Sequence, residues 1–362
     1  MNKKIRVFIV DDSLLFRKVL IDNLSQNPNI EVVGYAIDAF DAERKIPLLK
    51  PDVVTVDVEM PRISGIDFVK KLLPKYAVPV ILVSSMNLNV FEALSAGAVD
   101  FVRKPDMTVS NSSSTFLNTL MSKIFIASRA KIKVPAAAAS PAPAVIRTTP
   151  GSGKPFSLNA CNTVIAIGAS TGGTEATLQV LKNLPADTPG IVVTQHMPEG
   201  FTKMYADRLN RLCQMSVKEA QSGDLIERGR VLIAPGDLQM KVVRVGSRYS
   251  VNCFSGEKVS GHRPSVDVLF QSVADTAGAN SVGIIMTGMG RDGADGLFNM
   301  KKKGAYTIGQ DAESCVVYGM PMVAYNIGAV VTQTSCTNIS NVLLKHLYSC
   351  LLYTSPSPRD CS

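Results

Sequence analysis

Short runs of β-branched and other apolar residues alternate with segments of helical spacing, and few folds accommodate such an alternation. In the first third of the chain the apolar runs lie at 5–10, 53–56 and 79–83, with helical spacing at 15–24 and 66–73. Apolar strands separated by helices are typical of a parallel sheet covered by helices. The pattern therefore predicts an α/β fold.

A stretch rich in Ala, Pro, Gly and Ser interrupts this pattern at 133–155, with the sequence KVPAAAASPAPAVIRTTPGSGKP. This composition is typical of an extended or flexible linker. The chain has 362 residues, which is enough for two domains of ordinary size. We therefore expect a domain boundary in this stretch, preceded by a helix near 116–130.

A second α/β pattern follows the linker. Its apolar runs lie at 163–168, 191–195, 231–234, 281–288 and 329–332. Between the third and fourth runs, residues 241–254 alternate around Gly246 and Ser247, a pattern that is typical of a β-hairpin. We expect a second α/β domain that carries an inserted hairpin.

Cysteine usage and the N-terminal residues favour a cytoplasmic protein. The seven cysteines are odd in number and never spaced as C-x-x-C, which argues against a disulfide framework and against a structural zinc site. Asp11 and Asp12 interrupt the first apolar run, and no apolar stretch of about 18 residues follows it. We expect neither secretion nor membrane insertion.

The net charge of +8 does not by itself indicate a nucleic-acid partner. The Lys and Arg residues are dispersed, without a basic helix and without interleaved aromatic residues. A basic, solvated surface explains this distribution better than a nucleic-acid interface does. We expect no nucleic acid among the partners.

Three carboxylates end two strands of the first domain. Asp11 and Asp12 follow one apolar run and Asp57 follows another, so in a doubly wound sheet they would meet at its carboxyl edge. A hard divalent cation such as Mg²⁺ would relieve their mutual repulsion. Ser84, which follows a third run, and Lys104 can reach the same edge. Taken singly, each of these residues is equally compatible with a helix cap or a surface charge.

Their joint order, DD, then D-x-x-M-P-x-x-x-G, then a strand-end Ser, then K-P, resembles the response-regulator receiver family over residues 3 to about 125. The resemblance implies a flavodoxin-like domain with a doubly wound, five-stranded parallel sheet, in which Asp57 accepts a phosphoryl group from a histidine kinase. The implied Mg²⁺ ligands are Asp11, Asp12, Asp57 and the backbone carbonyl of Glu59. Ser84 and Lys104 would sense the acyl phosphate, and a cis peptide would precede Pro105.

The second domain has a serine in a tight turn between a strand and a helix. Ser170 lies in GASTGG, where its hydroxyl would lie near backbone amides and the positive end of a helix. The same position also suits a helix cap or a phosphate-binding turn. The motif matches neither G-x-S-x-G nor G-x-x-x-x-G-K-[ST]. Ser170 is therefore a candidate nucleophile that this motif alone does not establish.

A serine nucleophile needs a base and a carboxylate that orients the base. His196 follows the apolar run at 191–195, which suits a general base, although a packing histidine is equally compatible with this position. The glycine-rich loop MTGMGRDGADG supplies both Asp292 and Asp295. Periodicity does not distinguish between these two carboxylates.

Four segments, GASTGGTEA, TQHMPEGFT, GHRPSVDVLF and MTGMGRDGADG, resemble the catalytic domain of the chemotaxis protein-glutamate methylesterases over about 162–345. The resemblance implies a Rossmann-like, doubly wound α/β domain without a dinucleotide. It assigns Ser170 as the nucleophile, His196 as the base and acid, and Asp292 as the carboxylate. Thr171 and Met289 would lie near the oxyanion hole.

The segment GHRPSVDVLF is expected to line the substrate groove. His262 and Arg263 of this segment are equally compatible with a structural role. No metal and no other cofactor is expected for the hydrolysis itself.

Together the two resemblances predict four parts: a receiver domain at 1–125, a helix end and linker at 126–160, a catalytic domain at 161–347, and a tail at 348–362 that is disordered or an artefact of the sequence. The expected function is that of a phosphorylation-activated hydrolase. It would demethylate glutamyl methyl esters on methyl-accepting chemotaxis receptors, release methanol, and deamidate specific receptor glutamines. The expected phosphodonor is the chemotaxis histidine kinase, and we expect a monomer.

Two other function classes fit the sequence less well. A phospho-regulated DNA-binding protein would need a recognition helix in its output domain, and 162–345 shows neither a helix-turn-helix pattern nor a basic helix. A nucleotide-binding enzyme would need an acidic ribose partner about 20 residues after GASTGG. The only acid at 187–193 is Asp187, in a turn before the strand rather than at its end.

Overall fold

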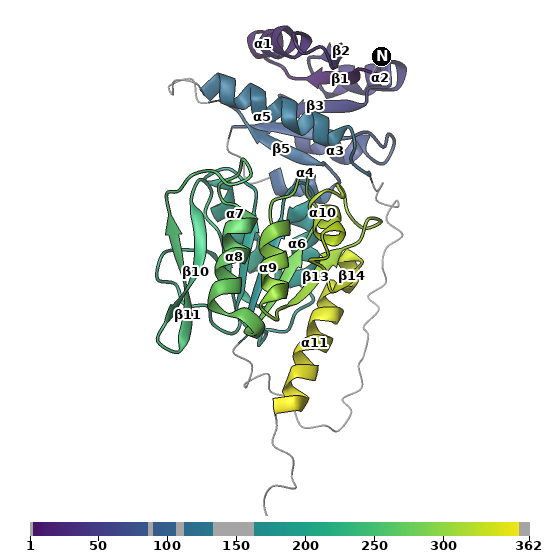
Figure 1. Ribbon diagram of the computed structural model, residues 1–362. Coiled ribbons are helices and arrows are strands. Elements are labelled where there is room, and N and C mark those ends of the chain that lie inside the picture. The colour runs from purple at the N-terminus through teal and green to yellow at the C-terminus, as the bar shows by residue number, and fades with distance from the viewer. Residues whose placement is uncertain (1–2, 86–89, 106–111, 133–162, 355–362) are drawn as a thin grey trace, which may run out of the picture. The chain divides into compact units, whose positions relative to one another are not determined.

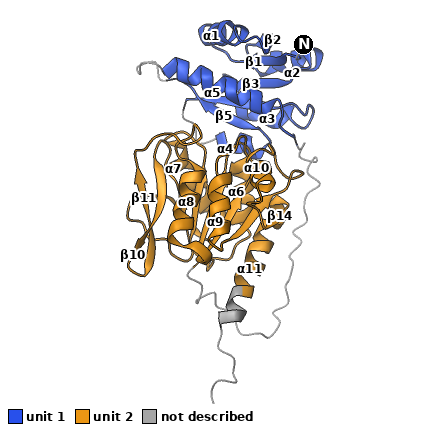
Figure 2. Cartoon of the chain, viewed as in Figure 1, with its two compact units in different colours: residues 1–141 blue, residues 142–362 orange. Residues whose placement is uncertain are grey.

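Two parallel sheets organise the chain, one in each of two compact units, 1–141 and 142–362 (Figure 2). The computed structural model describes residues 3–85, 90–105, 112–132 and 163–354. The two units divide inside the segment expected to be the linker, and the Ala/Pro-rich stretch 133–155 itself lies outside the described residues.

The first unit contains a five-stranded parallel sheet in the order β2-β1-β3-β4-β5. Its strands are β1 (Ile5–Val10), β2 (Ile30–Ala36), β3 (Val53–Asp57), β4 (Val80–Ser84) and β5 (Asp100–Arg103). This is the flavodoxin-like order, and it confirms the fold expected for this part of the chain. The central strands β3 and β4 are buried along their whole length, because helices cover both faces of such a sheet.

The helices of the first unit are α1 (Leu14–Ser25), α2 (Ala39–Leu49), α3 (Gly65–Leu72), α4 (Val90–Ser95) and α5 (Ser112–Ala127). Side chains cap the first three, since Ser13, Asp38 and Ser64 accept hydrogen bonds from backbone amides of the first helical turn. At Gly65, a Cβ atom would lie 1.9 Å from the carbonyl oxygen of Asp57. Only glycine allows α3 to begin so close to the end of β3.

The second unit contains a seven-stranded parallel sheet in the order β14-β13-β12-β6-β7-β9-β8. Its strands are β6 (Val164–Ala169), β7 (Ile191–Gln195), β8 (Ser216–Glu219), β9 (Arg230–Ile233), β12 (Ser281–Ile285), β13 (Tyr306–Gln310) and β14 (Thr332–Thr334). The chain starts in the middle at β6, builds one side, and crosses to β12 on the other side. The carboxyl ends of β6 and β12 therefore flank the switch point where doubly wound sheets bind their ligands.

The helices of the second unit are α6 (Gly173–Leu181), α7 (Phe201–Leu212), α8 (Val266–Thr276), α9 (Ala294–Lys302), α10 (Met320–Asn326) and α11 (Ile339–Thr354), with short 3₁₀ turns η2 (Gly278–Asn280) and η3 (Cys336–Asn338). Helices α8 and α9 pack side by side (Figure 1). The expected hairpin is present as β10 (Gln239–Val245) and β11 (Arg248–Phe254), and it packs against α8.

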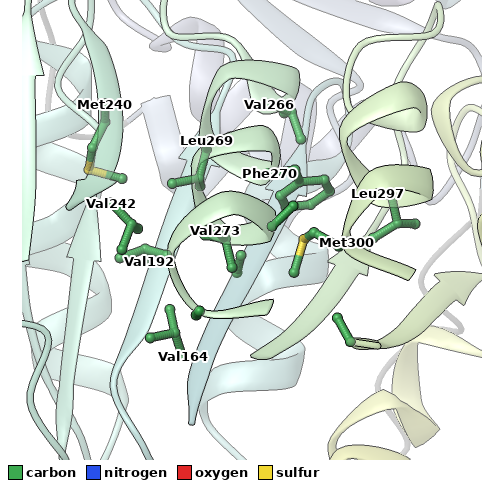
Figure 3. Packing of buried hydrophobic residues seen from close by; sticks show 14 of the residues in the cluster. Val164, Val192, Met240, Val242, Val266, Leu269, Phe270, Val273, Leu297 and Met300 are labelled. Atoms are coloured by element: carbon green, nitrogen blue, oxygen red, sulfur yellow. The ribbon is translucent and has the colours of Figure 1, made fainter. Parts of the chain in front are cut away.

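Helix α8 lies at the centre of the core of the second unit (Figure 3). Its residues Leu269, Phe270 and Val273 are fully buried, in one cluster with Val164 and Val192 of the sheet. Truncating a buried Phe to Ala typically costs about 3–5 kcal/mol of folding free energy. This packing fixes the N-terminus of α8 above the carboxyl ends of the strands.

Helix α11 continues to Thr354, within the segment 348–362 expected to be a tail, and residues 355–362 of that segment lie outside the described residues. One expectation about the chain differs from the structure. Among the described residues the only cis peptide is Arg263–Pro264, so the cis peptide expected before Pro105 is wrong. The trans form is the intrinsically preferred one for most X-Pro bonds.

No helix within the described ranges is long and apolar enough to cross a membrane.

Candidate functional site

The three carboxylates of the first unit meet at one edge of its sheet. Asp11 and Asp12 follow β1 and Asp57 ends β3, and β1 and β3 are neighbours. One oxygen from each of the three carboxylates lies within 4.8 Å of the other two. Asp11 and Asp57 are buried, whereas Asp12 is exposed. The structure therefore brings together the residues that the sequence suggested as a cation site.

The electrostatics of this cluster favour a bound cation. Burial, and after it the charge of Asp57, raises the pKa of Asp11 to about 6. Burial also raises the pKa of Asp57, although the hydrogen bond from Lys104 opposes it. Carboxylate oxygens are the ligands that Mg²⁺ prefers in proteins. A hard divalent cation fits this donor set, because it would offset the cost of ionising buried carboxylates.

Lys104, Glu59 and Ser84 surround Asp57 on the same edge. Lys104 Nζ donates to Asp57 Oδ2 at 2.7 Å, and the Glu59 amide donates to Asp57 Oδ1 at 3.0 Å. The Ser84 hydroxyl is buried without a hydrogen-bond partner in the described structure, and the Ser84 carbonyl accepts from the Lys104 amide. By contrast, the Ser85 hydroxyl is engaged by the Glu59 side chain. Ser84 is thus available to a group attached to Asp57, and the Glu59 carbonyl as a cation ligand stays a prediction.

In the second unit, Ser170, His196 and Asp292 come from the ends of three neighbouring strands. Ser170 follows β6, His196 follows β7, and Asp292 lies in the loop after β12. His196 Nδ1 lies 3.1 Å from Ser170 Oγ, and His196 Nε2 lies 2.7 Å from Asp292 Oδ2. The side chains of His196 and Asp292 are only 7% and 1% exposed. The structure joins these residues in one hydrogen-bonded series.

Backbone contacts hold Ser170 in place. Its amide donates to the Thr287 carbonyl at 2.9 Å, and its carbonyl accepts from Gln195 Nε2 at 2.8 Å. A Cβ atom at Gly288 would lie 2.6 Å from Ser170 Cβ. Gly172 has φ +77°, which lets the chain turn directly into α6. The glycines near Ser170 therefore permit a close packing that larger residues would prevent.

Asp292 is fully satisfied by hydrogen-bond donors. Its Oδ1 accepts from the Ser265 hydroxyl at 2.7 Å and from the Asp267 amide at 3.1 Å, and its Oδ2 accepts from the Val266 amide at 2.7 Å. Burial raises the pKa of Asp292, but the hydrogen bonds, that from His196 foremost, outweigh burial and hold the pKa below its ordinary value. Asp292 is therefore a stable carboxylate at neutral pH.

Geometry also distinguishes the two candidate carboxylates of the loop. Asp295 is an exposed residue that pairs with Arg291 at 2.7 Å, in the first turn of α9. Nothing links its carboxylate to His196, whereas Asp292 contacts the imidazole directly. The sequence did not predict that Ser265 and Val266, at the N-terminus of α8, donate hydrogen bonds to Asp292. In the sequence, Ser265 resembles an ordinary helix cap.

The two residues suggested near the oxyanion hole lie in the turn of Ser170 and in the loop after β12. Thr171 is buried in the same turn, and its carbonyl accepts from the Thr287 hydroxyl at 3.0 Å. Met289 follows Gly288, at which a Cβ atom would clash with Ser170, and the Met289 side chain is partly exposed. The Met289 amide makes no hydrogen bond to any part of the chain that the structure describes. That amide can therefore receive an oxyanion, and its role stays a prediction.

A second histidine, His262 of the segment GHRPSVDVLF, also reaches this site. The ring of His262 stacks on that of His196, with centroids 3.7 Å apart and an angle of 12° between the planes. Arg263 pairs with Asp237 at 2.7 Å. The sequence left the roles of both residues open, since only the fold brings this loop over His196.

Two family models match the chain. A CheB methylesterase model matches residues 165–343, within the second unit, and a response regulator receiver domain model matches residues 7–109, within the first.

Curated relatives extend this likeness to nearly the whole length. The protein-glutamate methylesterase/protein-glutamine glutaminase 2 of Syntrophomonas wolfei subsp. wolfei is 53% identical over 343 residues, which is 95% of this chain and 98% of the relative. The protein-glutamate methylesterase/protein-glutamine glutaminase of Salmonella typhi is 44% identical over 347 residues, 94% and 96% of the two chains. The crystal structure of the Thermotoga maritima CheB methylesterase catalytic domain matches with a TM-score of 0.50 and 35% identity, covering 51% of this chain and 98% of that one.

Proposed function

The chain belongs to the family of protein-glutamate methylesterases/protein-glutamine glutaminases with a receiver domain, and on that premise we propose that it hydrolyses glutamyl methyl esters on methyl-accepting chemotaxis receptors. The observation that supports this chemistry is the series Ser170, His196 and Asp292. A hydroxyl, an imidazole and a buried carboxylate in this order are the components of a serine hydrolase.

The ring nitrogens of His196 have defined roles. An ionised carboxylate only accepts hydrogen bonds, so the hydrogen on Nε2 points to Asp292. In the neutral imidazole Nδ1 then has a free lone pair toward the Ser170 hydroxyl, 3.1 Å away. The two nitrogens are exchanged relative to the serine proteases, in which Nε2 faces the serine. Either nitrogen can act as the base, because in the neutral imidazole one ring nitrogen carries the hydrogen and the other has a free lone pair.

Acylation begins when Ser170 Oγ attacks the ester carbonyl and His196 Nδ1 takes its proton. Asp292 stabilises the imidazolium that forms, since its carboxylate stays ionised and accepts the hydrogen on Nε2. His196 then passes the proton to the departing methoxide, and methanol leaves. The Met289 and Thr171 amides are the proposed oxyanion donors, and removal of one such donor typically costs about 10²–10³ in kcat.

Deacylation uses the same groups in reverse. Water gives a proton to His196 and attacks the acyl carbonyl, Ser170 recovers its proton, and a receptor glutamate is released. A glutamine side chain can follow the same path with ammonia in place of methanol. The protein would thus deamidate specific receptor glutamines and reset receptor modification during sensory adaptation.

The receiver domain controls this activity through Asp57. A histidine kinase of the chemotaxis system is the proposed phosphodonor. Asp11, Asp12 and Asp57, with the Glu59 carbonyl, would hold Mg²⁺, which when bound neutralises charge on the incoming phosphoryl group. Lys104 and the unpaired Ser84 hydroxyl would then contact the phosphoryl oxygens and bias a two-state surface of the domain. We propose activation as the direction of control, in a monomeric cytoplasmic enzyme.

Methanol release from membranes that carry methylated receptors tests the proposal. The protein should release methanol and leave an equal amount of new glutamate on the receptor, as peptide mass spectrometry can measure. Receptor glutamines at the modified sites should become glutamate in the same assay. Methyl esters that survive incubation with folded, phosphorylated protein would contradict the proposed function.

A further inference from the structure

A second histidine covers one face of the His196 ring. The planes of His262 and His196 are nearly parallel, 12° apart, and their centroids lie 3.7 Å from each other. This separation is van der Waals contact over the whole ring. His196 bonds to Ser170 and Asp292 through its two ring nitrogens. These hydrogen bonds fix the direction in which each nitrogen points, but they restrict rotation of the ring about the line between the two nitrogens less strongly. A stacked ring restricts that rotation.

The loop that carries His262 is firmly held. The amides of Val259 and His262 donate to each other's carbonyls at 3.1 and 2.9 Å, which closes a tight turn. Arg263 donates to Asp237 Oδ1 through Nε at 3.0 Å and through a terminal nitrogen at 2.7 Å, and its other terminal nitrogen donates to the Gly256 carbonyl at 2.7 Å. A side chain on an anchored loop can impose its orientation on its neighbour.

The same segment also holds the other end of the imidazole. Ser265 and Val266, a few residues after His262, donate to Asp292. The buried Gln239 ties the segment together, because its Oε1 accepts from the Ser265 amide at 2.8 Å and its Nε2 donates to the Glu257 carbonyl at 2.8 Å. One rigid segment therefore fixes both the face of His196 and the carboxylate that orients it.

We propose that His262 is a positioning residue for the reaction, which stacks on His196 and holds its ring in the plane that joins Ser170 to Asp292. The inference rests on the proposed hydrolase function. Small losses of alignment between nucleophile and base are costly, about 10²-fold for a displacement of about 1 Å. His262 needs no hydrogen bond to the substrate for this effect.

Three variants of the full chain separate stacking from other roles. His262→Ala removes the ring and should lower kcat by about 10- to 100-fold, with little change in KM. His262→Phe keeps a flat ring and should restore most of kcat. His262→Gln keeps hydrogen-bonding capacity without a ring and should behave as His262→Ala does. The measurement is methanol release from methylated receptor membranes over a range of receptor concentrations.

His346 provides a matched control. Its ring stacks on Tyr306 at 4.0 Å and 10° in the second unit, on α11 rather than beside His196. His346→Ala removes a stacked histidine of the same kind and should change kcat by no more than about twofold. Circular dichroism and the midpoint of thermal unfolding show whether the second unit of each variant is folded, and phosphorylation of Asp57 by a small phosphodonor shows that the receiver is intact.

Each outcome either supports or overturns the inference. Full kcat in His262→Ala, or equal rescue by His262→Gln and His262→Phe, would overturn it, as would a rise in KM at unchanged kcat. If His262→Ala does not fold, the difference between the Phe and Gln variants still decides. A wild-type protein that releases no methanol would refute the proposed function instead, so the two failures are distinguishable.

Discussion

The acidic cluster of the receiver domain and the triad of the catalytic domain both lie at the carboxyl edge of a parallel sheet, but they are built in opposite ways. In the receiver, carboxylates crowd one another, and burial raises the pKa of Asp11 and of Asp57. In the catalytic domain, Asp292 is surrounded by donors that hold its pKa below the ordinary value. We propose that the first site is stabilised by a bound cation, which would offset the repulsion between its carboxylates, whereas the second is already organised for its reaction.

This difference suggests that the two sites have different roles. A site whose charges are unbalanced responds to ligands, because ligand binding changes its electrostatic energy. A site whose charges are already paired with hydrogen-bond donors needs no rearrangement of its polar groups during the reaction. Regulation and catalysis can thus occupy equivalent positions of two similar folds and still depend on opposite electrostatics.

The largest expected effect is that of Ser170→Ala. Loss of the nucleophile should lower kcat for methanol release by about 10⁴-fold or more, because neither His196 nor Asp292 can replace it. Phosphorylation of Asp57 by a small phosphodonor should be unchanged, since that site belongs to a separate unit. Methanol release and phosphorylation are measured on the same preparation, and retained release would contradict the role of Ser170.

Asp292→Asn should have the second-largest effect on kcat. The amide cannot stabilise the imidazolium and favours the wrong tautomer of His196, so kcat should fall by about 10⁴-fold or somewhat less. Asp295→Asn is the matched control, because this exposed carboxylate pairs with Arg291 and with no other residue in the described ranges, and it should change kcat by no more than about twofold. Equal losses in both variants would show that the choice of Asp292 is wrong.

The affinity for Mg²⁺ should depend on pH in the receiver. Because the pKa of Asp11 is raised to about 6, protons compete with the cation below that pH, and affinity should fall by up to about tenfold for each pH unit on the acid side. Above about pH 7 the affinity should level off. Isothermal titration calorimetry measures this dependence in Ser170→Ala, which keeps the receiver intact. A flat profile across pH 5 to 7 would contradict the proposed electrostatics.

Ser265→Ala should have the smallest effect. It removes the hydroxyl that donates to Asp292 at 2.7 Å and also caps α8, and each of these contributions is typically worth about 1 kcal/mol. We expect a loss of about tenfold in kcat and a lower midpoint of thermal unfolding. Ser265→Thr keeps the hydroxyl and should lose less of both. If Ala and Thr were equally impaired, packing rather than the hydroxyl would explain the loss.

Much of the fold could be predicted from sequence because central strands have a strong signal. The runs at β1, β3, β4, β6 and β7 are almost wholly apolar, since both faces of these strands are buried. The sequence did not predict the edge strands β2 and β8. Both carry partly exposed residues, so their sequence patterns resemble those of loops. The last strand was placed at 329–332, but it lies at Thr332–Thr334, in a polar segment that follows the apolar one.

The site residues could be predicted in part. Strand-end positions and family motifs pointed to Asp57 and Ser170 as centres of two sites, and the structure brings their expected partners to them. Contacts made by the loop between β11 and α8 could not be foreseen, because they depend on how α8 packs on the sheet. The stack of His262 on His196 and the donation from Ser265 to Asp292 arise only when that helix is in place.

Stimulation of methanol release by a small phosphodonor tests most directly whether the acidic site controls the triad. With Mg²⁺ present, addition of the phosphodonor should increase the rate for the wild-type protein. The rate of Asp57→Asn should equal the unstimulated wild-type rate and should not respond. Control of the hydrolase by Asp57 would be contradicted if the wild-type rate did not change while Asp57 was phosphorylated. It would also be contradicted if the phosphodonor stimulated Asp57→Asn as strongly as the wild type.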